Sequence, residues 1–212
     1  MNKATIVVVD DHKMIREMWM QMFASHPTAE VIGESGEYNE AIQLILAKRP
    51  DIVLLDINLP PHSGMDAVPI LRKHVPGVKI IAVSMHNQPA YAKKMIQLGA
   101  KAYVTKNSSQ KEMFKAVEEV LHGRTFICSE IKEKISELFV KGEEVVHDVK
   151  GLSLREIEII KLIQNGLSSK EIATHLSISV RTAEVHRHNI LKKLHLKNTA
   201  ALINFINNNS LV

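Results

Sequence analysis

Thr5-Ile6-Val7-Val8-Val9-Asp10-Asp11 is an apolar, mostly β-branched run that ends in two adjacent carboxylates. Runs of this kind predict a strand with both faces buried, as in a parallel sheet. A second run, Ile52-Val53-Leu54-Leu55, also ends in a carboxylate, Asp56. We therefore expect a parallel sheet whose strands carry charge at their carboxyl ends.

Similar runs alternate with helical patterns through the first 123 residues, which is the signature of βα units. We expect an α/β fold, a five-stranded doubly wound parallel sheet with strand order 2-1-3-4-5, followed by a small all-α four-helix helix-turn-helix domain. The strands are predicted at 5–9, 30–34, 51–55, 79–83 and 102–104. Helices are predicted around Ile15–Phe23 and at 39–48, 65–74, 88–98 and 109–122.

Two helix ends carry specific expectations. Pro69 is tolerated only in the first turn of a helix, so the helix that holds it should begin near Asp66. Ser109 and Glu112 have the spacing of a capping box, in which each side chain bonds the other residue's backbone N–H.

The chain divides into three predicted segments, a first domain at 1–123, a linker with a possible helix at 124–151, and a helical domain at 152–212. The helices of the last segment are predicted at 153–165, 169–176, 180–194 and 198–208. Capping boxes open the first two, at Ser153/Glu156 and Ser168/Glu171, and the turn Ser177-Ile178-Ser179 precedes the third.

Composition narrows the class of protein. No apolar run approaches the roughly 20 residues that a membrane helix needs, and no secretory signal opens the chain. The single cysteine, Cys128, excludes an intrachain disulfide and fits a reducing compartment, so we expect a cytoplasmic protein. The last segment, 152–212, holds 8 Lys+Arg against 4 Asp+Glu, which makes it the place to look for nucleic-acid binding.

Polar residues stand at or just beyond four predicted strand ends, and in a doubly wound sheet these ends meet at one edge. They are Asp10 and Asp11, Asp56, Ser84 and Lys106. Three crowded carboxylates need a compensating cation, and an all-oxygen site with room for water suits Mg²⁺. A metal and an ammonium would neutralise a transferring phosphoryl group while one aspartate acts as the nucleophile.

These residues resemble the pattern of a response-regulator receiver domain, over residues 5–122. The resemblance implies that Asp56 accepts a phosphoryl group from a sensor histidine kinase, with Lys106 beside it. It also implies that Mg²⁺ is held by Asp10, Asp11, Asp56 and the backbone carbonyl of Asn58, and that Ser84 and Tyr103 rearrange on phosphorylation. The pattern is carried by Asp10-Asp11, Asp56-x-x-Leu59-Pro60-x-x-Ser63-Gly64, Ser84, Tyr103 and Lys106.

An aspartyl-phosphate phosphatase is the main catalytic competitor, but that class resembles Asp-x-Asp at the first strand, whereas this chain has Asp10-Asp11-His12. We expect a regulator and not an enzyme. Asn58 and His86 follow the acceptor and the switch hydroxyl by two residues each, and we hypothesise that they set the lifetime of the acyl phosphate.

The predicted helix 180–194 has a polar face opposite its apolar one, since Arg181, Glu184, Val185, His188 and Lys192 recur at helical spacing. As the second helix of a helix-turn-helix, it is the candidate for the major groove of DNA. Residues 152–206 resemble the LuxR-type helix-turn-helix of the NarL/FixJ family of bacterial response regulators. The resemblance implies base contacts by Glu184, Val185 and His188, and phosphate contacts by Lys170, Arg181, Thr182, Arg187, Lys192 and Lys193.

Thr199 stands where that family often has arginine, which makes part of the last helix's contact pattern uncertain. By resemblance the chain is a transcription regulator that forms a homodimer on promoter DNA when phosphorylated. Two alternatives stay open, a regulator whose DNA affinity ignores phosphate, and a module whose helical domain binds protein.

Overall fold

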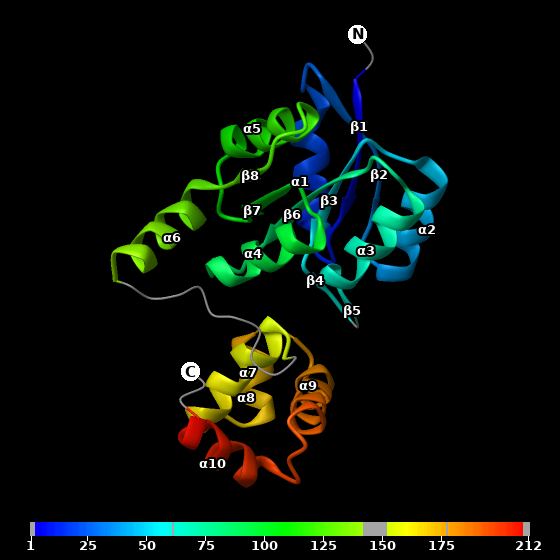
Figure 1. The fold of residues 1–212 in the computed structure, drawn as a ribbon. Coiled ribbons are helices and arrows are strands. Elements are labelled where there is room, and N and C mark those ends of the chain that lie inside the picture. Colours follow the sequence, from blue (N-terminus) through cyan, green and yellow to red (C-terminus); the bar gives the residue numbers. More distant parts are fainter. Residues whose placement is uncertain (1–2, 61, 142–151, 177, 210–212) are drawn as a thin grey trace. The chain divides into compact units, whose positions relative to one another are not determined.

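The computed structural model describes residues 3–60, 62–141, 152–176 and 178–209. The chain forms two compact units, Met1–Val145 and Val146–Val212, which are described separately (Figure 1). Residues 142–151 of the predicted linker and Ser177 of the predicted turn lie outside the described residues. Within the described ranges, no helix is long and apolar enough to cross a membrane.

The first unit is built on a parallel sheet with the order β2-β1-β3-β6-β7-β8. Its first five strands in that order confirm the predicted 2-1-3-4-5 arrangement. They are β1 (Ala4–Val9), β2 (Ala29–Ser35), β3 (Ile52–Asp56), β6 (Lys79–Ser84) and β7 (Ala102–Thr105). Every residue of β3 is buried, because this strand lies at the centre of the sheet with helices on both faces.

The prediction of five strands is wrong by one. A sixth, β8 (Phe126–Ile127), pairs in parallel with β7, and the helix α6 (Ser129–Lys141) follows it. Two residues are too short to give a periodic signal, which is why this stretch was assigned to the linker. A hairpin of β4 (Asn58–Leu59) and β5 (His62–Ser63) also follows β3.

Helices cover both faces of the sheet (Figure 1). On one face, neighbouring helices contact in the order α2, α3, α4, and on the other α1 meets α5, where the rings of Phe23 and Phe114 lie 5.5 Å apart. These helices are α1 (Lys13–Ala24), α2 (Tyr38–Lys48), α3 (Gly64–His74), α4 (Pro89–Leu98) and α5 (Gln110–Leu121).

Two expectations about helix ends need correction. Helix α3 begins at Gly64 and not near Asp66, because Ser63 and Asp66 form a capping box that fixes its start and leaves Pro69 in the second turn. At α5, the Ser109 side chain accepts from the Glu112 N–H as expected, but Glu112 does not return the bond. Its carboxylate instead accepts from the backbone N–H of Ser129, at 2.7 Å.

The second unit contains α7 (Leu154–Gln164), α8 (Ser169–His175), α9 (Val180–Lys193) and α10 (Thr199–Asn209), matching the four predicted helices. Both predicted capping boxes, Ser153/Glu156 and Ser168/Glu171, are present. The helices bury one apolar cluster, and α9 contributes Ala183 and Ile190 to it. This burial leaves the opposite face of α9 toward solvent.

Candidate phosphorylation site and nucleic-acid interface

Strand register brings the predicted polar residues to one edge of the sheet. Asp56 ends β3 opposite Val83 of β6, and Ser84 ends β6 opposite Thr105 of β7. Lys106 follows at once, and its N–H donates to the Ser84 carbonyl at 2.8 Å. Asp10 follows β1, the other neighbour of β3. Buried backbone ladders therefore place side chains that are distant in sequence beside one another.

Lys106 pairs with two carboxylates at once. Its Nζ lies 2.7 Å from Asp56 Oδ2 and 2.7 Å from Asp10 Oδ2, and all three side chains are almost fully buried. Burial raises the pKa of Asp56 to about 6, with the Asp10 charge adding to it, although Lys106 pulls the other way. Burial alone would lower the pKa of Lys106, but Asp56 and Asp10 outweigh it and raise the pKa.

A group of possible metal ligands surrounds this pair. Ligand atoms of Asp10, Asp11, His12 and Asp56 all lie within 4.8 Å of one another. Asp10 Oδ2 is buried and pairs with Lys106 Nζ at 2.7 Å, and a carboxylate oxygen in such a pair keeps a further lone pair for a cation. Hard carboxylate oxygens from three aspartates, gathered within 4.8 Å of one another, fit Mg²⁺. The described residues thus fit the expected ion.

Two contacts refine the predicted ligand set. The backbone N–H of Asn58 donates to Asp56 Oδ1 at 3.0 Å and orients that carboxylate, while the role of its carbonyl as a ligand stays a prediction. His12, which the sequence reasoning did not assign, donates its N–H to Asp10 Oδ1 and has its Nδ1 2.6 Å from Asp11 Oδ1. Its place directly after the aspartate pair was the available signal.

The predicted switch residues, Ser84 and Tyr103, are both fully buried and both bind the backbone of His86. The His86 N–H donates to Ser84 Oγ at 3.0 Å, and the Tyr103 hydroxyl donates to the His86 carbonyl at 2.8 Å. A shift of Ser84 would therefore be transmitted to Tyr103 through the backbone of one residue, His86.

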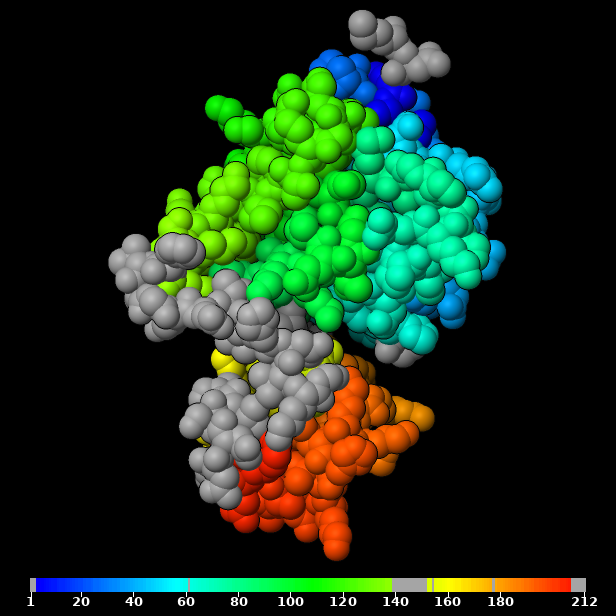
Figure 2. Space-filling model, viewed as in Figure 1, coloured from blue at the N-terminus to red at the C-terminus, as the bar shows by residue number. Residues whose placement is uncertain are grey.

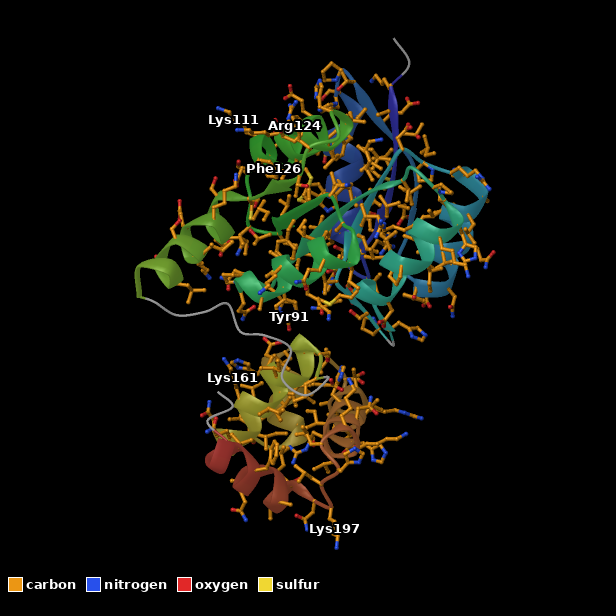
Figure 3. All side chains as sticks on the ribbon, viewed as in Figure 1. Tyr91, Lys111, Arg124, Phe126, Lys161 and Lys197 are labelled. Carbon is orange, nitrogen blue, oxygen red and sulfur yellow. The ribbon has the colours of Figure 1, made fainter. Side chains whose placement is uncertain are left out.

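The structure also brings Asn58 and His86 together, with His86 Nε2 3.4 Å from Asn58 Oδ1. The imidazole stacks on Tyr91 of α4, with ring centroids 4.1 Å apart and planes 5° apart (Tyr91 is labelled in Figure 3). The stacking holds the imidazole in place beside Asn58, in the loop after Asp56.

Gly64, the first residue of α3, packs directly against the backbone of Asp56. A Cβ at this position would lie 1.9 Å from the Asp56 carbonyl oxygen, so only glycine fits. The Gly64 N–H also donates to the Ile57 carbonyl at 2.8 Å. The loop after Asp56 is thereby pinned to the helix that follows it.

In the second unit, the predicted polar face of α9 is exposed. Figure 2 shows the stretch that contains α9, coloured orange, on the surface of this unit. An exposed valine, Val185, lies among charged and polar neighbours and is 51% accessible. The exposed residues of this face are Arg181, Glu184, Val185, His188 and Lys192, and Lys170 on α8 is exposed as well.

Three of the other predicted DNA contacts are engaged within the unit. Lys193 Nζ lies 2.7 Å from Glu156 Oε2, and Glu156 is only 3% exposed. Arg187 donates to Thr199 Oγ1 at 3.2 Å and to the Leu167 carbonyl at 3.5 Å, so Thr199 has an internal partner. Thr182 Oγ1 lies 2.7 Å from Ser179 Oγ at the start of the helix. Phosphate contact by these side chains stays a prediction.

Comparisons with known proteins follow this division. The family described as response regulator receiver domain matches residues 6–118, and the family described as bacterial regulatory proteins, luxR family, matches residues 150–206. The oxygen regulatory protein NreC of Staphylococcus epidermidis is 33% identical over 207 residues, covering 94% of this chain and 95% of NreC.

Two solved structures extend the likeness. A two-component response regulator of the LuxR family from Aurantimonas sp. SI85-9A1 is 34% identical with a TM-score of 0.62, over 66% of this chain and 99% of that one. RcsB of Salmonella enterica serovar Typhimurium, bound to a promoter in the presence of the phosphomimetic BeF3⁻, has a TM-score of 0.59 at 22% identity, over 97% and 98% of the two chains, and shows a shared fold.

Proposed function

This chain belongs to the NarL/FixJ family of two-component response regulators, transcription regulators with a LuxR-type DNA-binding helix-turn-helix, and from that premise we propose that phosphorylation of Asp56 controls its binding to promoter DNA. The phosphodonor is a sensor histidine kinase. The single observation that carries the proposal is the buried contact of Lys106 with both Asp56 and Asp10.

In the reaction, an ionised Asp56 oxygen attacks the phosphorus of a phosphohistidine. The P–N bond breaks, a P–O bond forms, and the product is an acyl phosphate. Lys106 stays within reach of the added phosphoryl oxygens and stabilises their charge. At pH 7 a pKa of about 6 leaves Asp56 mostly ionised. The Asn58 N–H holds the other carboxylate oxygen in place.

We propose Mg²⁺ as the cofactor, held by Asp10, Asp11, Asp56 and the Asn58 carbonyl. When bound, the ion neutralises phosphoryl charge that one ammonium cannot balance. Asn58 and His86, which approach each other beside this site, set the lifetime of the acyl phosphate in our hypothesis. Asn58→Ala and His86→Ala should therefore change the dephosphorylation rate, and unchanged rates in both variants would reject it.

The DNA contacts are proposed on the exposed face of α9. Val185 suits the methyl group of thymine, and Glu184 can accept from the amino group of cytosine. Arg181, Lys192 and Lys170 are exposed cations that suit backbone phosphates. We also propose that the phosphorylated chain binds as a homodimer, since paired half-sites call for a two-fold protein.

A direct test uses a small-molecule phosphodonor. The full chain is incubated with acetyl phosphate and Mg²⁺, and phospho-Asp56 is quantified on a phosphate-affinity gel and located by mass spectrometry. We expect one modified residue in the wild type and none in Asp56→Asn. Wild-type protein that stays unmodified, or that carries phosphate elsewhere, would contradict the proposal.

A further inference from the structure

Glu130 in the first turn of α6 links the loop after β6 to the last residue of β7, where the loop after that strand begins. Its Oε1 accepts from Asn87 Nδ2 at 2.8 Å, and its Oε2 accepts from Thr105 Oγ1 at 2.8 Å. Thr105 is 1% exposed, and the Glu130 side chain is 32% exposed. Hydrogen bonds to an ionised, partly buried carboxylate are stronger than neutral ones. This pair of contacts links α6 to the edge of the sheet at two points.

Both loops belong to the phosphorylation site. Asn87 directly follows His86, whose backbone is bound by Ser84 and Tyr103. Thr105 directly precedes Lys106, which contacts Asp56. The Glu130 carboxylate therefore closes a chain of contacts that starts at Asp56. One arm runs through Lys106 and Thr105, and the other runs through Asn58, His86 and Asn87, with Ser84 and Tyr103 bound to the His86 backbone.

The start of α6 is anchored to the same elements by its backbone. The Cys128 N–H donates to the Tyr103 carbonyl at 3.0 Å, and the Ser129 N–H donates to Glu112 of α5 at 2.7 Å. Helix α6 also lies beside α4, which follows the Asn87 loop (Figure 1). A movement of either loop thus reaches a helix that directly precedes, in sequence, the segment leading to the DNA-binding unit.

We propose that Glu130 is a positioning residue of the phosphorylation site, which couples the state of Asp56 to the N-terminal turn of α6. The inference rests on the proposed phosphorylation of Asp56. Because coupling between two sites is reciprocal, a ligand at Asp56 changes the stability of the α6 start through Glu130, and loss of Glu130 removes that response. A residue that merely capped α6 would stabilise the helix equally with and without a ligand at Asp56.

The experiment measures amide hydrogen exchange of the full chain with and without beryllofluoride, a phosphoryl mimic, and Mg²⁺. In the wild type, beryllofluoride should change exchange both in the loops around Asp56 and at the start of α6, by about tenfold if one charged hydrogen bond is altered. Glu130→Ala and Thr105→Val should keep the response around Asp56 and lose the response of α6. Glu130→Gln, which retains one acceptor oxygen, should respond to an intermediate degree.

Glu133→Ala is the matched control, because Glu133 is an exposed glutamate on the same helix. It should behave as wild type. Unchanged exchange in β1 and β3 establishes that a variant is folded. If wild-type α6 does not respond while the Asp56 loops do, or if Glu130→Ala responds like the wild type, the coupling role is wrong. If beryllofluoride changes nothing around Asp56 in the wild type, the proposed phosphorylation itself fails, and this inference with it.

Discussion

The phosphorylation site and the α9 face use charge in opposite ways. At the sheet edge, Asp10, Asp56 and Lys106 are buried and must satisfy one another. On α9, Arg181 and Lys192 are exposed. The role of each lysine or arginine therefore follows from its burial and its partners, and not from its charge alone. Lys106 pairs with Asp10 and Asp56, Lys193 pairs with Glu156, and Lys192 is exposed to solvent.

The largest effect on stability is expected at Lys106, the buried cation of the sheet edge. Lys106→Ala leaves two buried carboxylates without their cation, and we expect the first unit to lose about 3 kcal/mol of unfolding free energy in the absence of divalent ions. Urea unfolding followed by Trp19 fluorescence measures this, since Trp19 is the sole tryptophan and is buried in α1. Lys101→Ala, at an exposed lysine before β7, should stay within about 0.5 kcal/mol of wild type.

The next largest effect is expected at Gly64, which packs against the backbone of Asp56. Gly64→Ala places a methyl group 1.9 Å from the Asp56 carbonyl oxygen, so the loop or the helix must move. We expect a loss of about 1–3 kcal/mol by the same unfolding assay and slower phosphorylation by acetyl phosphate. Gly33→Ala in β2 is the control, because a methyl group there makes ordinary van der Waals contacts with the Leu44 and Lys48 side chains. Equal stability of the two variants would refute the close packing.

Substitutions of the adjacent lysines Lys192 and Lys193 on α9 should affect DNA binding and stability, respectively. Lys193→Ala leaves buried Glu156 without its cation, and since Lys193 is 42% exposed the expected loss is only about 1 kcal/mol. Lys192→Ala should leave stability unchanged and flatten the log-log salt dependence of DNA binding by about 0.9. Urea titration followed by NMR of the helical unit, together with binding isotherms at several salt concentrations, measures both. The reverse pattern would overturn the assignment.

The smallest effect concerns pH. Burial lowers the pKa of His186 on α9, and the charges of Arg155 and Lys193 add to this against the opposing charge of Glu156. The folded state therefore binds its proton less readily than the unfolded state, whose pKa is 6.5. The contribution of neutral His186 to the unfolding free energy is fully present above pH 6.5. It is lost as the pH falls from there through the pKa of the folded state. NMR titration should give a His186 pKa below 6.5, and His186→Gln should weaken this pH dependence of the urea midpoint.

The sequence predicts the positions of site residues correctly where they stand at the end of a periodic strand pattern or along one face of a helix. The strand ends at Asp10, Asp56 and Ser84 follow apolar runs, so their meeting at one edge was predictable. The α9 face followed from helical spacing. Strand β8 was not predictable, because two residues carry no period and its pairing depends on the edge of β7.

Side-chain contacts between elements that are distant in sequence could not be predicted either. Lys193 meets Glu156 across 37 residues, and Glu112 leaves its capping box to bind Ser129. In both cases the local sequence predicts one role, a DNA contact for Lys193 and a capping box for Glu112. The folded chain supplies a different partner that is distant in sequence. Asn58 and His86 lie between these extremes, since their positions relative to two strand ends predicted proximity but not the 3.4 Å approach.

Phosphate on Asp56 is proposed to control DNA binding through the α9 face. The most direct measurement is the affinity of the full chain for a duplex selected from random DNA, with and without acetyl phosphate and Mg²⁺. We expect tighter binding on phosphorylation in the wild type, no change in Asp56→Asn, and weak binding in both states for Arg181→Ala. Equal affinity of phosphorylated and unphosphorylated wild-type protein would contradict this proposal.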